Sequence, residues 1–372
     1  MDKANLNIAK LSPIYGNNIG DIMISKCIEY MAEREGVAIK TYDILLREPC
    51  SYSQKKKTVA LRVHVSAFLQ FYIPGLFSLI KKIIYSIKRD GRRYEEITSG
   101  YDAVIVGGGN IIMDKMGSDY ICRVDSICRQ SKSPVYIYAA GAGPINNEKA
   151  AKRIKEHASF VSVRDSGSQF LMGKDGVHLN YDPAFVISDI TSIERKGGVL
   201  GVNVISGCFS RNDLECLAAD VASYASENKF SVRIIVTAYP NDLIESEALA
   251  ANIAALNDRL FVEIMKTTPD IESISKAYAD LDFFVGCRMH SLIFSLSHAV
   301  PSIGYEWDPK VQGMFKMFFG DFYATSMLYR PGGGISNKPF LGIDIESHAS
   351  RVKKEVYSQF GQLIKLIKEN EK

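Results

Sequence analysis

Short apolar segments alternate with longer amphipathic segments along most of the chain. Runs of strand length occur at 102–107 (DAVIVG), 134–140 (PVYIYAA), 178–187 (HLNYDPAFVI) and 283–286 (FFVG). Stretches such as 214–229 and 242–257 place apolar residues at helical spacing. Apolar strands that alternate with amphipathic helices are typical of parallel sheets covered by helices. The pattern therefore predicts an α/β protein.

The chain is long enough for two such units. Its 372 residues exceed the size of one ordinary core. A charged stretch at 188–198 ends in two glycines and marks the expected boundary. We predict two Rossmann-like, doubly wound domains that face a cleft, at 1–190 and 196–340, followed by an amphipathic helix at 343–372.

Residues 55–93 differ from the rest of the chain in being strongly basic, with Asp90 as the only acid. Apolar residues from Leu76 to Ile87 fall at helical spacing, with lysines elsewhere on the wheel. The run is too short to span a bilayer, which takes roughly 20 residues. Two interpretations remain open: an ordinary helix on a core, or a basic insertion that contacts an anionic membrane surface.

Composition narrows the function classes. The chain is 47% hydrophobic and 23% charged, with a net charge of only +3, so nothing suggests a nucleic-acid partner. Seven cysteines without a C-x-x-C pair argue against a disulfide framework or a zinc site. No clustered ligand set predicts a metal, and no apolar signal segment opens the chain. We expect a cytoplasmic protein without a cofactor.

The strongest chemical signal is GCRMHS, at 286–291, directly after an apolar strand. Arg288 and His290 stand two residues apart there, with Met289 between them and Ser291 at the start of a helix. A guanidinium, an imidazole and a helix N-terminus all attract anions. We predict that this segment binds a ligand, whereas His298, inside the apolar helix, is expected to be a packed core residue.

Glycine-rich turns follow three other predicted strands. The first, NNIGD, contains Asn18, Gly20 and Asp21, and Asp21 is suited to cap the next helix. The second, VGGGN, is expected to face a ligand, and the third is AAGAGP. Their candidate cleft residues are Gly107, Gly108, Gly109, Asn110, Gly141 and Gly143.

Arg164 in SVRD ends a strand that is otherwise apolar, so its charge requires a partner. One interpretation is a structural pair with Asp165 or Asp182. The other is a fork for a carboxylate or a phosphate. Asp182, in the rigid turn DPAF, is interpreted as structural.

Taken together, NNIGD, VIVGGGN, AAGAGP, VSVRD, YDPAF and GCRMHSLIFSLSHAVPSIGY resemble the polysaccharide pyruvyl transferase family in order and spacing over about residues 10–320. The resemblance implies a glycosyltransferase-B-like arrangement of two Rossmann-like domains. It implies that phosphoenolpyruvate is the co-substrate. The acceptor would be a sugar of a surface polysaccharide or of its lipid-linked precursor, and the product would be a pyruvate ketal on that sugar. A lipid-linked acceptor would place the protein at the inner face of the membrane.

The resemblance also implies roles for individual residues. The R-x-H pair, which holds the donor and serves acid–base chemistry in that family, corresponds to Arg288 and His290, and the arginine of SVRD corresponds to Arg164. We predict that Arg288 and Arg164 bind phosphoenolpyruvate, with Met289 and Ser291 beside them. We also predict that His290 transfers protons, with Asp21 as a second catalytic residue. In the competing assignment His290 only contacts the phosphate, and Asp21 or Asp114 is the base. A different reaction, glycosyl transfer from a nucleotide sugar, is the alternative function, because fold alone does not separate the two.

Overall fold

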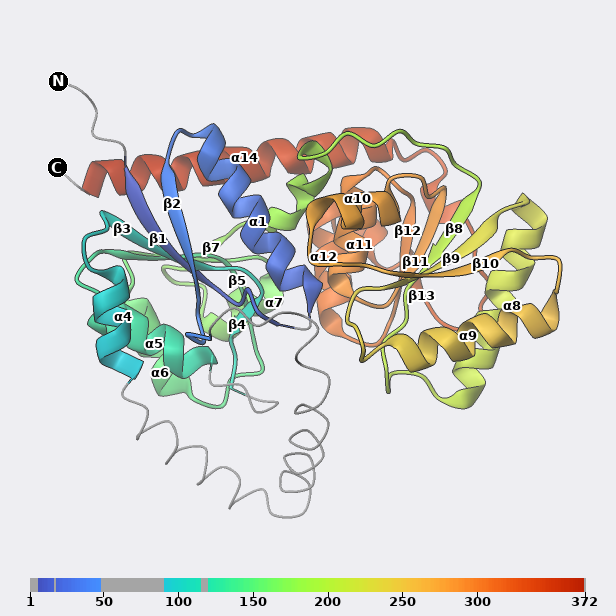
Figure 1. Cartoon of the computed structure of the whole chain (residues 1–372), viewed down its shortest axis with the longest axis horizontal. Coiled ribbons are helices and arrows are strands. Elements are labelled where there is room, and N and C mark those ends of the chain that lie inside the picture. The colour runs from blue at the N-terminus through green and yellow to red at the C-terminus, as the bar shows by residue number, and fades with distance from the viewer. Residues whose placement is uncertain (1–5, 17, 48–89, 115–119, 371–372) are drawn as a thin grey trace, which may run out of the picture.

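The computed structural model describes residues 6–16, 18–47, 90–114 and 120–370. Its N-terminal half contains the first of two parallel sheets (Figure 1). Its strands pair in the order β2-β1-β3-β5-β6-β7, and β4 pairs with β5. They are β1 (Asn7–Ser12), β2 (Ala38–Asp43), β3 (Ala103–Gly107), β4 (Asn110–Ile112), β5 (Val135–Ala142), β6 (Phe160–Val163) and β7 (His178–Leu179).

Both faces of this sheet are buried, which explains why its strands read as continuous apolar runs. Ile8 and Ile105 pack on the face covered by α1 and α14, and Ala9 and Val104 pack on the face covered by α4, α5 and α6 (Figure 1). The helices of this half are α1 (Ile19–Arg34), α4 (Asp90–Thr98), α5 (Tyr120–Gln130), α6 (Glu148–His157) and α7 (Ser166–Met172), followed by the 3₁₀ helix η1 (Pro183–Asp189).

The second sheet repeats the design, with strand order β10-β9-β8-β11-β12-β13. Its strands are β8 (Val199–Val202), β9 (Ser231–Val236), β10 (Val262–Lys266), β11 (Phe283–Gly286), β12 (Ser302–Tyr305) and β13 (Leu328–Tyr329). Its helices are α8 (Arg211–Asn228), α9 (Leu243–Leu256), α10 (Ile271–Tyr278), α11 (Met289–Ser297), α12 (Pro309–Phe319) and α13 (Asp321–Ala324), with η2 (Lys338–Phe340) after them.

Each sheet has a point at which the direction of winding reverses. The chain winds outward from β1 to β2 and then returns to β3 on the other side of β1. It repeats this in the second sheet, where β9 and β10 lie on one side of β8, and β11 to β13 lie on the other. Loops diverge at such a point, and ligands of doubly wound folds bind there. NNIGD, VGGGN and GCRMHS fall at these positions, whereas AAGAGP lies at the end of the neighbouring strand β5.

The last helix, α14 (Ile345–Asn370), returns to the first sheet after the second is complete (Figure 1). The ring of Phe360 packs edge-on against Tyr138, with 5.5 Å between centroids. Asn370 donates from Nδ2 to the Tyr136 hydroxyl at 3.0 Å. The C-terminal end of the helix therefore packs on the first sheet, while nearer its start Arg351 donates to the carbonyl of Phe318 in the second domain.

Two local predictions are wrong. The strand expected at 178–187 is limited to the two residues of β7, because Asp182 caps η1 through Ala184 N and Pro183 opens that helix. The cap of α1 is Asn18, whose side chain accepts from Gly20 N, and Asp21 stands in the first turn instead. Neither difference changes the strand order.

Candidate functional site

The carboxyl ends of the two sheets meet at the domain interface. Ile19, at the start of α1, donates its backbone N–H to the carbonyl of Thr237, which follows β9, at 3.4 Å. Arg164, which follows β6, lies 3.0 Å from His290, which follows β11. The two winding-reversal points therefore face one another, and the predicted site residues of both domains come together.

A buried cluster of Arg164, Asp182 and His290 joins the two domains. Arg164 donates from Nη1 to Oδ2 of Asp182 at 2.8 Å, and the same nitrogen lies 3.0 Å from Nε2 of His290. All three residues are at least nine-tenths buried. The structural interpretation of Arg164, with Asp182 as its partner, is thus the one observed. Asp165 instead caps α7 through Ser168 N.

The contact with Arg164 selects the tautomer of a neutral His290 ring. A guanidinium only donates hydrogen bonds, so Nε2 must accept, and the proton of the neutral ring lies on Nδ1. Nε2 is also 3.7 Å from Oδ2 of Asp182. Burial tends to raise the pKa of Asp182, but Arg164 and His290 outweigh it and lower that pKa to about 2. Asp182 is therefore an anion that can stabilise a protonated ring.

His290 packs against the first turn of α1 because residue 20 is glycine. A Cβ added at Gly20 would overlap Nδ1 of His290. Asp21 follows, and its Oδ2 accepts from the Asn18 side chain at 3.1 Å. Burial raises the pKa of the Asp21 carboxyl, and the charges of His290 and Arg164 oppose that shift. An imidazole and a carboxyl group thus lie near one another at a helix N-terminus.

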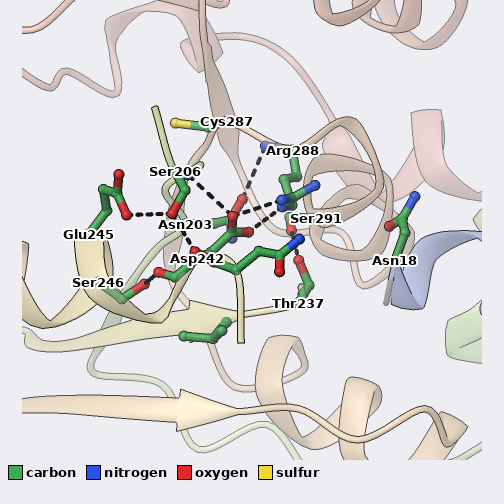
Figure 2. A network of polar contacts seen from close by, with 12 residues as sticks. Asn18, Asn203, Ser206, Thr237, Asp242, Glu245, Ser246, Cys287, Arg288 and Ser291 are labelled. Carbon is green, nitrogen blue, oxygen red and sulfur yellow. Dashed lines mark hydrogen bonds and ion pairs between the residues drawn. The ribbon is translucent and has the colours of Figure 1, made fainter. Parts of the chain in front are cut away.

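Arg288 belongs to a second network, held by Asp242 at the start of α9. Arg288 donates from Nη2 to Oδ1 of Asp242 at 2.8 Å and from Nε to Oδ2 (Figure 2). Its backbone N–H donates to Oδ1 of Asn203 at 3.0 Å, and Ser206 N donates to Asp242. Asp242 is fully buried, whereas 22% of the Arg288 side chain is exposed. Within the described residues Nη1 of Arg288 has no hydrogen-bond partner.

The glycine turns make room for these side chains. Gly108 and Gly109 have positive φ angles of 90° and 81°, and a Cβ at Gly109 would overlap the carboxylate of Asp21. A Cβ at Gly141 would lie 2.8 Å from Nη2 of Arg164 and 2.9 Å from Oδ1 of Asn110. Gly107 and Gly143 approach Tyr138 and Leu171 instead. The turns therefore bring backbone close to the acid and to the arginine.

Three predicted residues have other surroundings. The carboxylate of Asp114 accepts from the backbone N–H groups of Asn146 and Asn147, which fixes a loop. Ser291 is fully buried, and its hydroxyl lies 3.4 Å from that of Thr237. Met289 lines a cavity of about 10 Å³ behind the buried cluster, with room for about one water. These contacts are with protein rather than with an open surface.

Sequence reasoning missed Asp242 and Lys310. Lys310, in the first turn of α12, is half-buried. Burial lowers its pKa, Arg164 acts in the same direction, and the carboxylates of Asp308, Asp165 and Asp21 oppose it. Both residues could have been predicted from their position in the sequence, because each follows the carboxyl end of a strand of the second sheet. Asp242 follows β9, and Lys310 follows β12.

Neither a metal-ion site nor a membrane-spanning helix occurs in the described part of the chain. Among residues 6–16, 18–47, 90–114 and 120–370, no group of three His, Cys, Asp or Glu side chains is arranged to hold a metal ion. Over those same ranges, every helix is too short or too polar to traverse a bilayer. The predicted basic insertion at 55–93 lies outside the described residues, apart from the start of α4.

Solved structures of two UDP-N-acetylglucosamine 2-epimerases and a glycosyltransferase share the fold over nearly the whole chain. A putative UDP-N-acetylglucosamine 2-epimerase from Listeria monocytogenes gives a TM-score of 0.57 at 10% identity, covering 99% of this chain and 97% of that one. The UDP-GlcNAc 2-epimerase from Neisseria meningitidis, bound to UDP-GlcNAc, gives 0.51 at 10% identity, covering 97% and 100%. A glycosyltransferase from Rickettsia africae gives 0.50 at 11% identity, covering 99% of each chain. These likenesses confirm the predicted fold of two Rossmann-like domains in a glycosyltransferase-B-like arrangement.

Comparison of the sequence with family models identifies the family more specifically than the fold does. No curated protein matches the chain. The family model described as polysaccharide pyruvyl transferase matches residues 18–309, a range that contains every predicted site residue and ends just before Lys310.

Proposed function

The chain belongs to the polysaccharide pyruvyl transferase family, and on that basis we propose that it transfers the pyruvyl group of phosphoenolpyruvate to a sugar. The acceptor is part of a surface polysaccharide or of its lipid-linked precursor, and the product is a pyruvate ketal. The observation that carries the proposal is His290, which lies at the domain interface between the Arg164–Asp182 pair and the first turn of α1.

The reaction needs a group that both gives and accepts protons. C3 of phosphoenolpyruvate gains a proton, and a sugar hydroxyl then adds to C2 and loses its own proton. The bond from C2 to the phosphate oxygen breaks and phosphate leaves. A second hydroxyl of the same sugar adds to C2, loses its proton and closes the ring. Histidine is suited to such transfers near neutral pH.

The buried cluster gives His290 a means of holding either state. In the neutral ring Nε2 accepts from Arg164. A protonated ring would form an ion pair with Asp182, whose Oδ2 lies 3.7 Å from Nε2, and would present Nδ1–H towards α1 and Asp21. We assign the proton transfers to the His290 ring. Arg164 and Asp182 position the ring, and Asp21 is the second titrating group.

Arg288 and Lys310 are the cations we assign to the donor anion. Arg288 is oriented by its two hydrogen bonds to Asp242 and keeps Nη1 for a ligand. Lys310 approaches the interface from α12, near Asp21 and Arg164. A carboxylate and a phosphate on one small molecule match these two cations, both of which come from the second domain. Arg164 as a direct ligand of the donor stays a prediction.

Thermal unfolding with phosphoenolpyruvate, and separately with nucleotide sugars, tests the donor. A ligand that binds only the folded protein stabilises it by about 2.7 kcal/mol at a hundred times its Kd. We expect a shift with phosphoenolpyruvate. A shift with a nucleotide sugar in its place would favour glycosyl transfer.

Replacement of His290 tests the mechanism. In His290→Gln an amide oxygen can still accept from Arg164 while the titrating ring is lost. We expect kcat to fall about 10²–10⁴-fold with the donor-induced thermal shift retained. If only donor binding is lost, His290 is a phosphate contact, and Asp21→Asn becomes the variant in which kcat should fall.

A further inference from the structure

Three aromatic side chains lie together at the carboxyl edge of the second sheet, next to Arg288. The rings of Phe209 and Tyr305 stack, with centroids 4.6 Å apart and an interplanar angle of 17°. Trp307 donates from Nε1 to the carbonyl of Cys287 at 2.7 Å. Phe209 follows β8, Tyr305 ends β12, and Cys287 follows β11. The three residues therefore follow or end strands of the second sheet at its carboxyl edge, and Trp307 is hydrogen-bonded to the residue that precedes Arg288.

Trp307 differs from its two neighbours in being exposed. Its exposed fraction is 43%, although its only polar atom is already hydrogen-bonded inside the protein. The part of the indole that remains available is thus apolar ring surface, fixed in place at one end. Exposure of apolar ring surface to water is unfavourable in free energy, and such a surface can pack against a flat apolar partner.

The position of Trp307 links it to the two cations assigned to the donor. Cys287, which accepts its hydrogen bond, directly precedes Arg288. Lys310 lies three residues after Trp307, in α12. The point of winding reversal in this sheet lies between β8 and β11, whose loops carry Phe209 and Cys287. In doubly wound folds this is where ligands bind.

We propose that Trp307 binds the sugar acceptor by stacking against a pyranose ring. One face of such a ring consists largely of C–H groups, which pack on an aromatic face, while the hydroxyl groups at its rim stay free to react. Phosphoenolpyruvate is small and carries two anionic groups, so it offers no apolar face that could pack against the indole ring. The inference rests on the proposed function, because that function makes the acceptor a sugar.

The chain is suited to a direct test because Trp307 is its only tryptophan. Fluorescence excited at the indole band therefore reports on this one position. The probes are methyl glycosides of glucose, galactose, mannose and N-acetylmannosamine, each of which carries the ring face that is proposed to stack. We expect at least one of them to shift the emission and to protect it from acrylamide quenching.

The same glycosides are then offered with phosphoenolpyruvate, and ketal formation is followed by the methyl signal of the product. For an accepted sugar, we expect Trp307→Leu to raise the KM of the acceptor about tenfold with kcat little changed, as for the loss of one aromatic contact. Trp307→Phe keeps a flat ring and should lose less. Persistence of the donor-induced thermal shift in both variants shows that they are folded.

The outcomes separate the two proposals. Protection by a glycoside without ketal formation would overturn the proposed reaction and leave the sugar site standing. Ketal formation with no fluorescence response and an unchanged KM in Trp307→Leu would overturn the stacking role and leave the reaction standing. No protection and no ketal with any glycoside would overturn both.

Discussion

The two domains each contribute one arginine–aspartate pair to the interface, and the pairs differ in what surrounds them. Arg164 and Asp182 are both almost fully buried, and Arg164 also contacts His290. In the other pair Asp242 is fully buried, but the Arg288 side chain remains 22% exposed, with Nη1 unused within the described residues. The same chemical pair thus appears once as a closed cluster and once as an oriented, accessible cation.

The difference teaches that burial, rather than residue type, distinguishes a supporting arginine from a binding one. Arg164 uses Nη1 for its contacts with both Asp182 and His290, and its buried Nε has no hydrogen-bond partner within the described residues, so it holds a histidine in place while closed off from solvent. An arginine fixed at two nitrogens by a buried carboxylate has lost side-chain freedom before any ligand arrives, which reduces the entropy cost of binding. We assign Arg164 to the first role and Arg288 to the second.

The largest expected effect is on folding, from Asp182→Asn. This change leaves the buried Arg164 guanidinium without its counter-charge, and breaking a buried pair typically costs about 3–5 kcal/mol. The matched control is Asp242→Asn, where water can reach Arg288, so we expect a loss of about 1–2 kcal/mol. Urea unfolding followed by circular dichroism gives both values. Equal losses would mean that the two pairs do not differ as described.

The next effect is on donor binding, from the double variant Arg288→Gln with Asp242→Asn. Replacing both partners avoids a stranded buried charge, so the free energy of unfolding should stay within about 1 kcal/mol of the native value. A charge-assisted hydrogen bond is worth about 1.5–3 kcal/mol, so the Kd for phosphoenolpyruvate should rise about 10- to 100-fold. Calorimetric titration measures it directly.

The matching double variant in the other pair, Arg164→Gln with Asp182→Asn, should show the opposite profile. Its Kd for phosphoenolpyruvate is expected to stay close to the native value while kcat falls, because His290 loses the partners that orient it. A Kd that rises as much as in the Arg288 variant would show that Arg164 reaches the donor, as its position in SVRD suggests from sequence.

How far the sequence predicts this arrangement depends on the distance between partners along the chain. Apolar runs and glycine turns are local, so the parallel sheets and the loops at their carboxyl ends could be predicted. Arg164 and His290 are 126 residues apart, so their contact depends on how the two sheets face each other. Arg288 and Asp242 are 46 apart, and their contact depends on the strand order within the second sheet. Nothing in GCRMHS alone shows that its arginine is paired and its serine buried. Lys310 was missed for the same reason, since its neighbours Arg164 and Asp21 belong to the other domain.

The smallest expected effect tests the role assigned to the buried cluster of Arg164, Asp182 and His290, in which the His290 ring is held against α1. In Gly20→Ala the new methyl group would overlap Nδ1 of His290, so the ring must move away from Asp21. Overpacking of this kind costs about 1–3 kcal/mol, partly offset by roughly 1 kcal/mol from the better helix propensity of alanine. Gly361→Ala, in α14, is the control, because its methyl group would make only an ordinary contact at 3.5 Å from Glu35. We expect kcat to fall in the first variant alone, with a lower melting temperature there and an unchanged or higher one in the control. A fully active Gly20→Ala would mean that catalysis does not need the His290 ring in its place against α1, since the ring has to move for the methyl group to fit.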